Sequence, residues 1–365
     1  MDFRSSILWW AVKRRVAKDR PFIIAITGSI AKTSTKVAIG AVLGRAYPSQ
    51  VRVGFGNLNS FLGVPLAILD FKVDFYRQHI TWQWLWLLIL AIWRGLFTGL
   101  PKYLVLEFGA DYPGDIEQLA KMLPLDGAII TLIGPAHLAN YLSIEAIAEE
   151  KAKILTAIKP GGWALVNKND PYLNKLTLKD CPSEMVATKT EDIAINFARA
   201  VGEKMEISTD LINDALAVLP RSEGRLQLKD LGSVKLLDDS YNANPLSMAV
   251  ALKVLAKLPG RKVAILGDML ELGVNERKFH QEIGRLAAEK SDLVIGIGQL
   301  AKEYDGSNWY PDSMTAANEL LRMNTSKQSE RLFSVLREGD TVLVKGSHGV
   351  HMEIIAKAIE KNYKK

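Results

Sequence analysis

The sequence predicts an α/β protein with two domains, a P-loop-type parallel-sheet domain followed by a smaller Rossmann-like domain. The chain has 365 residues, and at about 150 residues per domain that length suits two domains. Short apolar runs rich in β-branched residues alternate with helical stretches in both halves, which is the pattern of parallel sheets. One early run leads into a glycine-started loop and a helix. We therefore expect domains at 1–222 and 223–365.

Composition places the chain among ordinary globular proteins. Hydrophobic residues make up 48% and charged residues 24%, which excludes a disordered tail, a collagen and a coiled-coil rod. The single cysteine, Cys181, excludes a disulfide framework and a cysteine-based zinc cluster. We therefore expect a reducing, cytoplasmic compartment.

The positive charge lies mostly in one short N-terminal arm. The net charge is +6, and residues 1–20 hold six basic and two acidic residues, so the other 345 residues carry only +2. No nucleic-acid-binding signature accompanies the arm, so nucleic acid is not an expected partner. An apolar patch at 7–12 precedes the basic run, an order that a signal peptide does not have. Two structures fit, an interfacial membrane helix and a helix packed on the domain with a solvated basic face.

A tryptophan-rich stretch, Ile80–Leu100, belongs to an insertion at about 76–100. The stretch has 21 residues with one charge, Arg94, and four of the chain's eight tryptophans. Its length suits a transmembrane helix, but it lies between the parts of one predicted nucleotide site, which a single crossing would separate. We expect a buried helix pair or a surface that contacts a membrane or a partner, and we favour the surface. Arg94–Gly95 predicts a break between two helices.

A phosphate-binding loop is predicted after the first strand, Pro21–Ile26. The loop opens with glycine and carries Lys-Thr ahead of the helical run Val37–Leu43. In such a loop backbone N–H groups and the helix dipole hold phosphate oxygens, the lysine reaches the outer phosphates, and the threonine hydroxyl can bind Mg²⁺. The alternative is an ordinary strand-to-helix turn with a solvated lysine. The predicted nucleotide-binding residues are Gly28, Ser29, Ala31, Lys32, Thr33 and Ser34.

Ala31 departs from the usual phosphate-loop pattern. The spacing here is G-x-x-A-K-T, and alanine stands where a second glycine is usual. Its Cβ is tolerable only if the backbone keeps a negative φ or accepts strain of about 1 kcal/mol.

Glu107 is a candidate for metal binding, and the positions of two more ionisable side chains, His137 and Lys151, are open to more than one interpretation. Glu107 ends an apolar strand, where a carboxylate beside a phosphate loop suits Mg²⁺; a strand-end glutamate in water is the alternative. His137 follows another apolar strand, and a lone histidine is more often structural than a ligand. Lys151 lies in a helix that starts near Ser143, and the alternative there is that Lys151 and Lys153 are both solvated.

Several motifs, in this order, resemble the Mur ligases of peptidoglycan synthesis, in particular the MurF-type branch that adds D-alanyl-D-alanine. The resemblance runs from about residue 22 to the C-terminus and is most specific in DDSYNANP and LGDMLELG. The motifs are Gly56–Asn59, Gly63–Pro65, Val105–Ala110, Pro113–Ile116, Gly134–Leu138, Glu149–Leu155, Gly224–Leu226, Asp238–Pro245, Leu266–Gly273 and Val344–Ser347.

This resemblance implies an ATP-dependent acid–amino-acid ligase. ATP converts a carboxylate into an acyl phosphate, and an amine, D-alanyl-D-alanine or a similar one, displaces the phosphate. The implied cofactors are ATP and Mg²⁺, with Lys151 carbamylated by CO₂; Lys153 stands where the family has glutamate. The implied catalytic residues are Lys32, Glu107, His137 and Lys151, and the implied metal ligands are Thr33, Glu107, His137 and Lys151.

The resemblance also implies nucleotide contacts outside the loop. In the family the C-terminal domain swings over the nucleotide and brings in the amine. The matching residues here are Asn196 on the adenine side, Arg225 facing the phosphates, Asp239 at the ribose and Asn244 beside the nucleotide, while Lys345 matches a further family position. Each of these could instead be a cap or turn residue.

The donor of the carboxylate is not identified by the sequence. Full-length ligases of the family carry an N-terminal domain that binds the uridine nucleotide, and the 20 residues before the first predicted strand are too few for a domain. We therefore expect that domain to be missing, with a muropeptide-type carboxylate as the donor and peripheral membrane contact near a lipid-linked precursor as a hypothesis. Two alternatives remain: a Mur-like ligase for a different or lipid-linked carboxylate, and a degenerate nucleotide-binding scaffold, with Ala31 and Lys153 as signs of decay.

Overall fold

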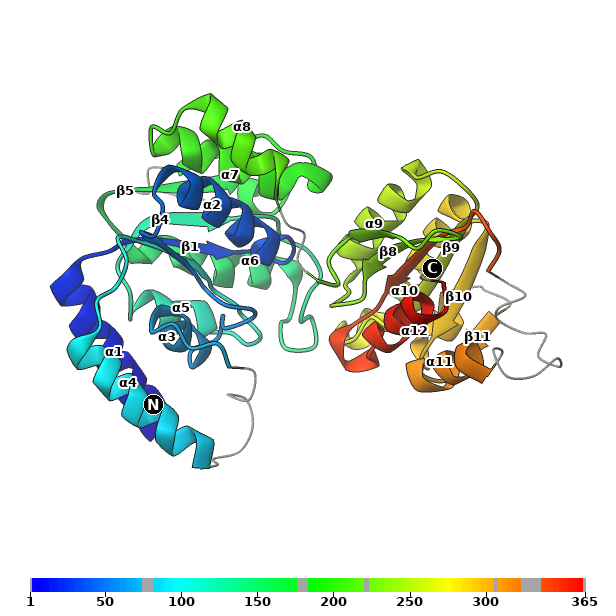
Figure 1. Cartoon of the computed structure of the whole chain (residues 1–365), viewed down its shortest axis with the longest axis horizontal. Coiled ribbons are helices and arrows are strands. Elements are labelled where there is room, and N and C mark those ends of the chain that lie inside the picture. Colours follow the sequence, from blue (N-terminus) through cyan, green and yellow to red (C-terminus); the bar gives the residue numbers. More distant parts are fainter. Residues whose placement is uncertain are drawn as a thin grey trace. The chain divides into compact units, whose positions relative to one another are not determined.

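The computed structural model describes residues 2–73, 82–175, 183–219, 223–304, 308–322 and 336–363. The chain folds into two compact units, each described here by itself (Figure 1). Unit 1 comprises Met1–Gly134 and Asn140–Leu219, and unit 2 comprises Pro135–Ala139 and Pro220–Lys365. Both are α/β, so the predicted fold class is confirmed.

Unit 1 is built on a six-stranded sheet in the order β2-β3-β1-β4-β5-β6, in which every neighbouring pair is parallel. The central strands are continuous apolar runs and are buried, as strands covered on both faces must be. The strands are β1 (Phe22–Thr27), β2 (Val51–Val53), β3 (Tyr103–Glu107), β4 (Leu125–Ile130), β5 (Ile158–Asn167) and β6 (Ser183–Val186).

Helices cover both faces of this sheet. In Figure 1, α2, α7 and α8 lie together above the sheet, and α3 and α5 lie below it. Short 3₁₀ turns lie at 153–157, 173–175 and 190–192. The helices are α2 (Lys32–Ala46), α3 (Gly63–Ile68), α5 (Asp115–Ala120), α6 (Ile144–Ala152), α7 (Ile193–Lys204) and α8 (Thr209–Ala217).

Two further helices of unit 1, α1 (Phe3–Asp19) and α4 (Trp82–Phe97), lie side by side (Figure 1). The predicted break at Arg94–Gly95 is wrong, because α4 continues through both residues. Gly95 instead lets the helices approach: a Cβ there would lie 2.7 Å from the Cβ of Ala11 and 2.9 Å from its Cα. The part of the insertion at 76–81 lies outside the described residues.

The α1–α4 pair is neither fully buried nor fully exposed. Each helix buries one face, with Leu8 and Val12 of α1 and Leu87 and Ala91 of α4 at most 3% exposed. The opposite faces remain exposed. No helix in the described part of the chain combines the length and the apolar character needed to cross a membrane.

Unit 2 contains a second six-stranded sheet, in the order β11-β10-β9-β12-β8-β7. All pairs are parallel except β7 with β8. The strands are β7 (Gln227–Asp230), β8 (Lys235–Asp239), β9 (Lys262–Gly267), β10 (Leu293–Ile297), β11 (Asn308–Tyr310) and β12 (Thr341–Lys345). The helices are α9 (Pro245–Lys257), α10 (Glu276–Lys290), α11 (Ser313–Arg322) and α12 (Glu353–Tyr363), with 3₁₀ turns at 273–275, 300–304 and 348–350.

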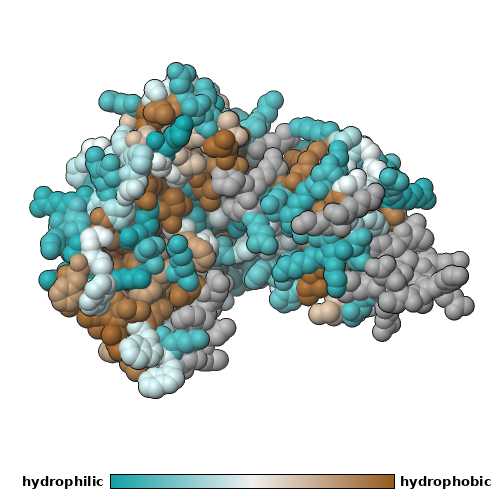
Figure 2. Space-filling view, viewed as in Figure 1, coloured by the Kyte–Doolittle hydropathy of each residue, from teal (hydrophilic) through white to brown (hydrophobic). Residues whose placement is uncertain are grey.

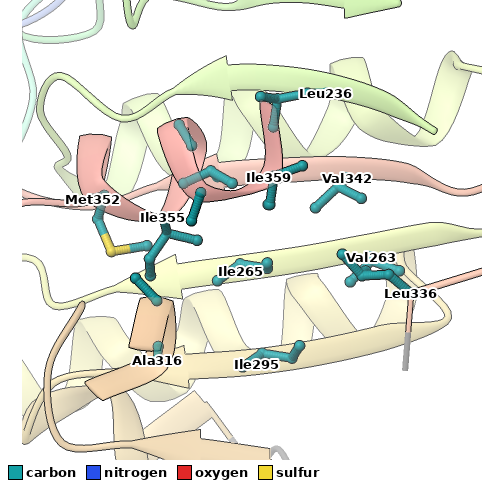
Figure 3. Close-up of a cluster of buried hydrophobic side chains, with 14 of the residues drawn as sticks. Leu236, Val263, Ile265, Ile295, Ala316, Leu336, Val342, Met352, Ile355 and Ile359 are labelled. Atoms are coloured by element: carbon teal, nitrogen blue, oxygen red, sulfur yellow. The ribbon is translucent and has the colours of Figure 1, made fainter. Parts of the chain in front are cut away.

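Alternating side chains divide the core of unit 2 between the two faces of its sheet. Figure 3 shows one face, where Val263 and Ile265 of β9 pack with Ile295 of β10 and with Ile355 and Ile359 of α12. The intervening residues of β9 belong to the other cluster, with α9 and α10. Because helices cover both faces of the sheet, the side chains on both sides of these strands are buried and therefore hydrophobic.

The close approach at Gly95 predicts that alanine destabilises the protein at Gly95 but stabilises it at Gly44, another helical glycine. Gly95→Ala must push α4 away from the backbone of Ala11, and overpacking of this kind lowers the free energy of unfolding by about 1–3 kcal/mol. Gly44→Ala in α2 meets no atom within 4 Å and should raise it by about 0.5–1 kcal/mol. Urea unfolding of both variants checks this; equal effects would contradict the packing role of Gly95.

Candidate functional site

The loop after β1 is closed by its own contacts. Gly28 has φ +145°, and a Cβ there would lie 1.9 Å from the Thr131 hydroxyl oxygen, so only glycine fits. Lys32 Nζ donates to the Gly28 carbonyl at 2.8 Å. Ser29 Oγ donates to the Gly134 carbonyl and accepts from the Gly134 N–H, both at 3.0 Å. The loop therefore lies against the end of β4, with α2 starting at Lys32 and half-buried Ser34 in its first turn.

Of the two predicted alternatives for Ala31, a negative φ or a strained backbone, the structure shows the strained backbone. It is the N-cap of α2 and has φ 60° and ψ 6°, in the left-handed region. The left-handed conformation costs an L-residue with a Cβ about 1–2 kcal/mol, a cost that glycine does not have. The loop thus keeps the backbone shape that glycine normally provides.

A buried carboxylate lies beside this loop. Glu107, at the end of β3, is 4% exposed. One of its oxygens accepts from the Thr33 hydroxyl at 2.7 Å and pairs with Lys36 Nζ at 3.5 Å. The other accepts from Asn59 Nδ2 at 2.9 Å. The alternative of a solvated strand-end glutamate is therefore wrong.

This donor set fits Mg²⁺. The Thr33 hydroxyl and the Glu107 carboxylate are hard oxygen donors that already lie within hydrogen-bond distance of each other. Across the residues that the structure describes, no three His, Cys, Asp or Glu side chains gather closely enough to hold a metal ion. Mg²⁺ commonly binds through one or two protein oxygens, with substrate phosphates and water completing its shell, so a full protein cage is not required.

Lys151 is a buried amine in α6, whose N-cap Ser143 accepts from the Ala146 N–H. Its residue is 2% exposed, so the alternative of a solvated lysine is wrong. Burial, and next the charge of Lys32, lower its pKa from 10.5 to about 7, although Glu107 and other carboxylates oppose that shift. Near neutral pH a large share of this amine is therefore uncharged, and it lies within electrostatic range of both Lys32 and Glu107.

Lys153, which departs from the family pattern, pairs with two carboxylates. Its Nζ lies 2.8 Å from a Glu150 oxygen and 3.3 Å from a Glu117 oxygen, and these partners raise its pKa. The other Glu150 oxygen accepts from the Ile116 N–H at 2.9 Å. Lys153 thus links α6 to α5, and local carboxylates offset the positive charge that it adds.

Asn196 connects α7 to the segment after β6. Its Nδ2 donates to the Thr188 hydroxyl at 2.9 Å, while Asn169 Nδ2 donates to the Thr188 carbonyl at 2.7 Å. Nearby, Asp170 accepts from the backbone N–H of Ile133 at 2.6 Å. The adenine-side role of Asn196 stays a prediction.

His137 lies in the short segment that belongs to unit 2. It has φ 58°, and its Nδ1 lies 2.5 Å from a carboxylate oxygen of Glu271. The Ala139 N–H donates to the Glu271 carbonyl at 3.0 Å. The motifs PAHL and LGDMLELG therefore meet within one unit, while the predicted role of His137 as a metal ligand stays a prediction.

Unit 2 holds a second buried carboxylate at a strand end. Asp239, at the end of β8, pairs with Lys345 Nζ at 2.6 Å, and its other oxygen accepts from the Leu226 N–H at 3.0 Å. Burial raises the Asp239 pKa, and the Lys345 charge opposes that shift. The guanidinium of Arg225 lies 4.2 Å from the ring centre of Tyr241. Arg225 and Asp239 are therefore brought to the same edge of the sheet.

Asn244 adopts the helix-cap alternative. Its side-chain oxygen accepts from the Ser247 N–H at 2.9 Å, and Ser247 Oγ accepts from the Asn244 N–H at 3.0 Å. This capping box begins α9. Its predicted nucleotide contact stays a prediction.

Two domain families match the chain. Residues 96–223 match the Mur ligase middle domain, and residues 224–348 match the family described as Mur ligase, glutamate ligase domain. The chain belongs to the Mur ligase family.

Named relatives of this Mur ligase share one activity in their names. The UDP-N-acetylmuramoyl-tripeptide–D-alanyl-D-alanine ligase of Buchnera aphidicola is 28% identical, over 94% of this chain and 76% of the relative. The Bacillus subtilis protein of the same name is also 28% identical, over 92% and 75%. The crystal structure of MurF from Acinetobacter baumannii aligns with TM-score 0.77 and 25% identity, over 98% of this chain and 81% of that one.

Sequence analysis did not assign a role to two residues that contact Glu107. Asn59 lies in a quoted motif without an assigned role, and it holds Glu107. Lys36 also contacts Glu107; it lies one helical turn after Thr33, a spacing that places both side chains on one face of α2. That spacing was the available signal for Lys36, whereas Asn59 depends on a contact between distant segments.

The strained backbone at Ala31 predicts a gain in stability for Ala31→Gly. Glycine removes the left-handed strain, but its greater freedom in the unfolded chain offsets part of that gain. The free energy of unfolding should therefore rise by about 0.5–1 kcal/mol. The control Ala38→Gly, at a buried position of the same helix, should lower it by about 1 kcal/mol or more. Urea unfolding measures both, and a loss of stability in Ala31→Gly would refute the strain.

Proposed function

We propose that this Mur ligase uses ATP to join D-alanyl-D-alanine, or a similar amine, to a carboxylate of a peptidoglycan precursor. One observation carries the proposal: the loop after β1 and the end of β3 meet at one point, where the buried Glu107 carboxylate accepts a hydrogen bond from the Thr33 hydroxyl at 2.7 Å. The names of the relatives supply the reaction. We retain 1–222 and 223–365 as the proposed domains.

The loop residues bind the phosphates of ATP. Backbone N–H groups at the start of α2 face phosphate oxygens, as at other helix N-termini, and Lys32 neutralises the outer phosphates. The hydrogen bond from Lys32 to Gly28 keeps its ammonium group at the loop rather than in solvent. The proposed binding set is Gly28, Ser29, Ala31, Lys32, Thr33 and Ser34, with Asn196, Arg225, Asp239 and Asn244 as further nucleotide contacts.

Thr33 and Glu107 are the proposed ligands of Mg²⁺, and His137 and Lys151 are proposed for metal binding on the family's pattern. When bound, Mg²⁺ supplies positive charge to the phosphoryl group that is transferred. Lys36 and Asn59 hold the Glu107 carboxylate in place.

The reaction is two successive substitutions. A carboxylate oxygen attacks the γ-phosphorus of ATP, forming a C–O–P bond as ADP leaves, and the product is an acyl phosphate. The amine then attacks the acyl carbon, loses a proton and expels inorganic phosphate. The protein contributes mainly position and charge neutralisation to this chemistry, which agrees with a site of lysines, a carboxylate and backbone N–H groups.

The exposed faces of α1 and α4 favour peripheral membrane contact as part of this function. Trp82, Trp86 and Phe97 are each more than 60% exposed on one helix, and apolar side chains gathered in this way mark an interaction surface. A precursor carried by a lipid is accordingly the alternative donor. The degenerate scaffold is opposed by the preserved contacts of Lys32, Thr33 and Glu107.

Phosphate release tests the ligase proposal. With ATP, D-alanyl-D-alanine and candidate muropeptide donors, Lys32→Ala should lower the rate by about 10³-fold or more, because a cation at the transferred phosphoryl group is lost. Lys72→Ala, at an exposed position of the same unit, should leave the rate unchanged. Binding of ATP by the wild-type protein with no release on any donor would favour the scaffold instead.

Carbamylation of Lys151 is a second test, with a predicted pH dependence. Only an uncharged amine adds CO₂, and the lowered pKa of about 7 leaves this amine mostly uncharged above neutral pH. In ¹³C-bicarbonate the wild-type protein should therefore show a carbamate resonance at pH 8 that declines as the pH falls below 7. Lys151→Met should lack the resonance and Lys121→Met, at an exposed lysine, should keep it. An unchanged spectrum in Lys151→Met would rule out the modification.

A further inference from the structure

The outward side of α4 carries a continuous apolar surface. Figure 2 shows hydrophobic side chains gathered at the lower left, where Figure 1 places α1 and α4. We call this surface the α4 face. It consists of eight large side chains, each at least 37% exposed: Trp82, Leu85, Trp86, Ile89, Leu90, Ile92, Trp93 and Phe97.

The α4 face is unusual because the helix is apolar on both sides. A surface helix ordinarily buries one apolar stripe and shows polar residues to water. Here Leu87, Leu88 and Ala91 point toward the protein and are at most 8% exposed, while the opposite side offers tryptophan, leucine and isoleucine. Single exposed apolar residues are common, but eight on one helix indicate an interaction surface.

A basic groove lies on the neighbouring helix α1. It has a volume of about 770 Å³ and is lined by Ser6, Trp10, Lys13, Arg14 and Lys18 of α1, with Met122 from the segment before β4. These α1 positions recur every three or four residues, so they share one helix face. Among the described residues that line the groove, none is acidic.

The cations of the groove differ from the other basic residues of α1. Arg4 pairs with Asp2, and Arg15 pairs with Asp19. Within the described residues, Lys13, Arg14 and Lys18 have no carboxylate within 4.0 Å, and they remain exposed. Their charge is therefore exposed to solvent and available to a ligand.

We propose that the α4 face enters the interfacial layer of an anionic bilayer and that the groove on α1 binds lipid headgroup phosphates. This inference rests on the membrane contact proposed above and names its ligand. Tryptophans prefer the interfacial layer, and an amphipathic surface with apolar and basic parts lies in the plane of a membrane rather than across it. With 16 residues, α4 extends about 24 Å, too short to span the hydrocarbon core but long enough to lie along its surface.

Charge favours a bilayer over a second copy of the chain as the occupant. A two-fold dimer through the α4 face brings the same patch of both chains together, and α4 contains no carboxylate that could pair with the cations of the groove. An anionic lipid surface instead supplies the opposite charge to Lys13, Arg14 and Lys18. Each basic side chain near such a surface strengthens binding about fivefold.

Within unit 1, helix α1 is in direct contact with the loop that holds the Glu107 carboxylate. The Trp9 indole N–H donates to the Phe61 carbonyl at 3.0 Å, and the two rings lie 5.5 Å apart. Asn59, two residues before Phe61, donates to Glu107. Binding through α1 and α4 therefore holds the site of unit 1 near the bilayer, where a lipid-linked carboxylate is presented.

Vesicle flotation of the full chain tests the inference. At low salt the wild-type protein should float with vesicles of phosphatidylcholine and phosphatidylglycerol, and more weakly with phosphatidylcholine alone. The triple variant K13E/R14E/K18E should bind the anionic vesicles about 100-fold less tightly or worse, and the double variant W86S/W93S should lose binding to both. The matched control K253E/R285E/K361E reverses three exposed charges of unit 2 and should bind within a few-fold of the wild type.

The outcomes separate the inference from the proposed function. If the groove variant binds vesicles as tightly as the wild type, the headgroup site is overturned but membrane contact is not. If the wild type does not float with vesicles, the headgroup site and the membrane contact are both overturned. A dimer in vesicle-free solution that W86S/W93S dissociates, with vesicles ignored, would assign the α4 face to self-association. With a soluble donor, the groove variant should release phosphate at the wild-type rate. Lys32→Ala should release it more slowly and should still float with the vesicles. The ligase reaction and membrane binding are therefore tested independently of each other.

Discussion

The buried carboxylate of Glu107 is the constraint on which unit 1 depends. A charge removed from water is costly unless other groups satisfy it. Two segments do so here: α2, through Thr33 in its first turn and Lys36 one turn later, and the loop before α3, through Asn59. The same contacts that stabilise the charge therefore bring the loop after β1, the Thr33 hydroxyl and the end of β3 to one place.

Unit 2 repeats this arrangement with different residues. Asp239 lies at the end of a parallel strand, is buried, and pairs with Lys345 at the end of the neighbouring strand. In both sheets polar side chains gather where the carboxyl ends of parallel strands meet, which is where open α/β sheets bind ligands. The position of these polar side chains thus follows from the sheet topology, because the buried apolar strands place their carboxyl ends at one edge of the sheet.

The α1–α4 pair shows how apolar sequence can be misinterpreted. Arg94 and Gly95 are local signals of a helix end, yet α4 continues through both. Gly95 lies where Ala11 of the partner helix approaches, and Arg94 stacks on Phe71 and donates to the Leu69 carbonyl. The polar head of Arg94 is satisfied by the protein, so neither residue interrupts the helix.

The sequence by itself determined the fold class, the position of the loop between β1 and α2, the strand that ends at Glu107 and the membership of the family, because periodicity and motifs are local properties of the chain. Only the tertiary structure decided that Ala31 is strained, that Asn59 holds Glu107, that Asn244 caps a helix and that Lys151 is buried enough to lose much of its charge. Strain, burial and pKa depend on atoms supplied by distant segments, and no pattern within one segment contains them.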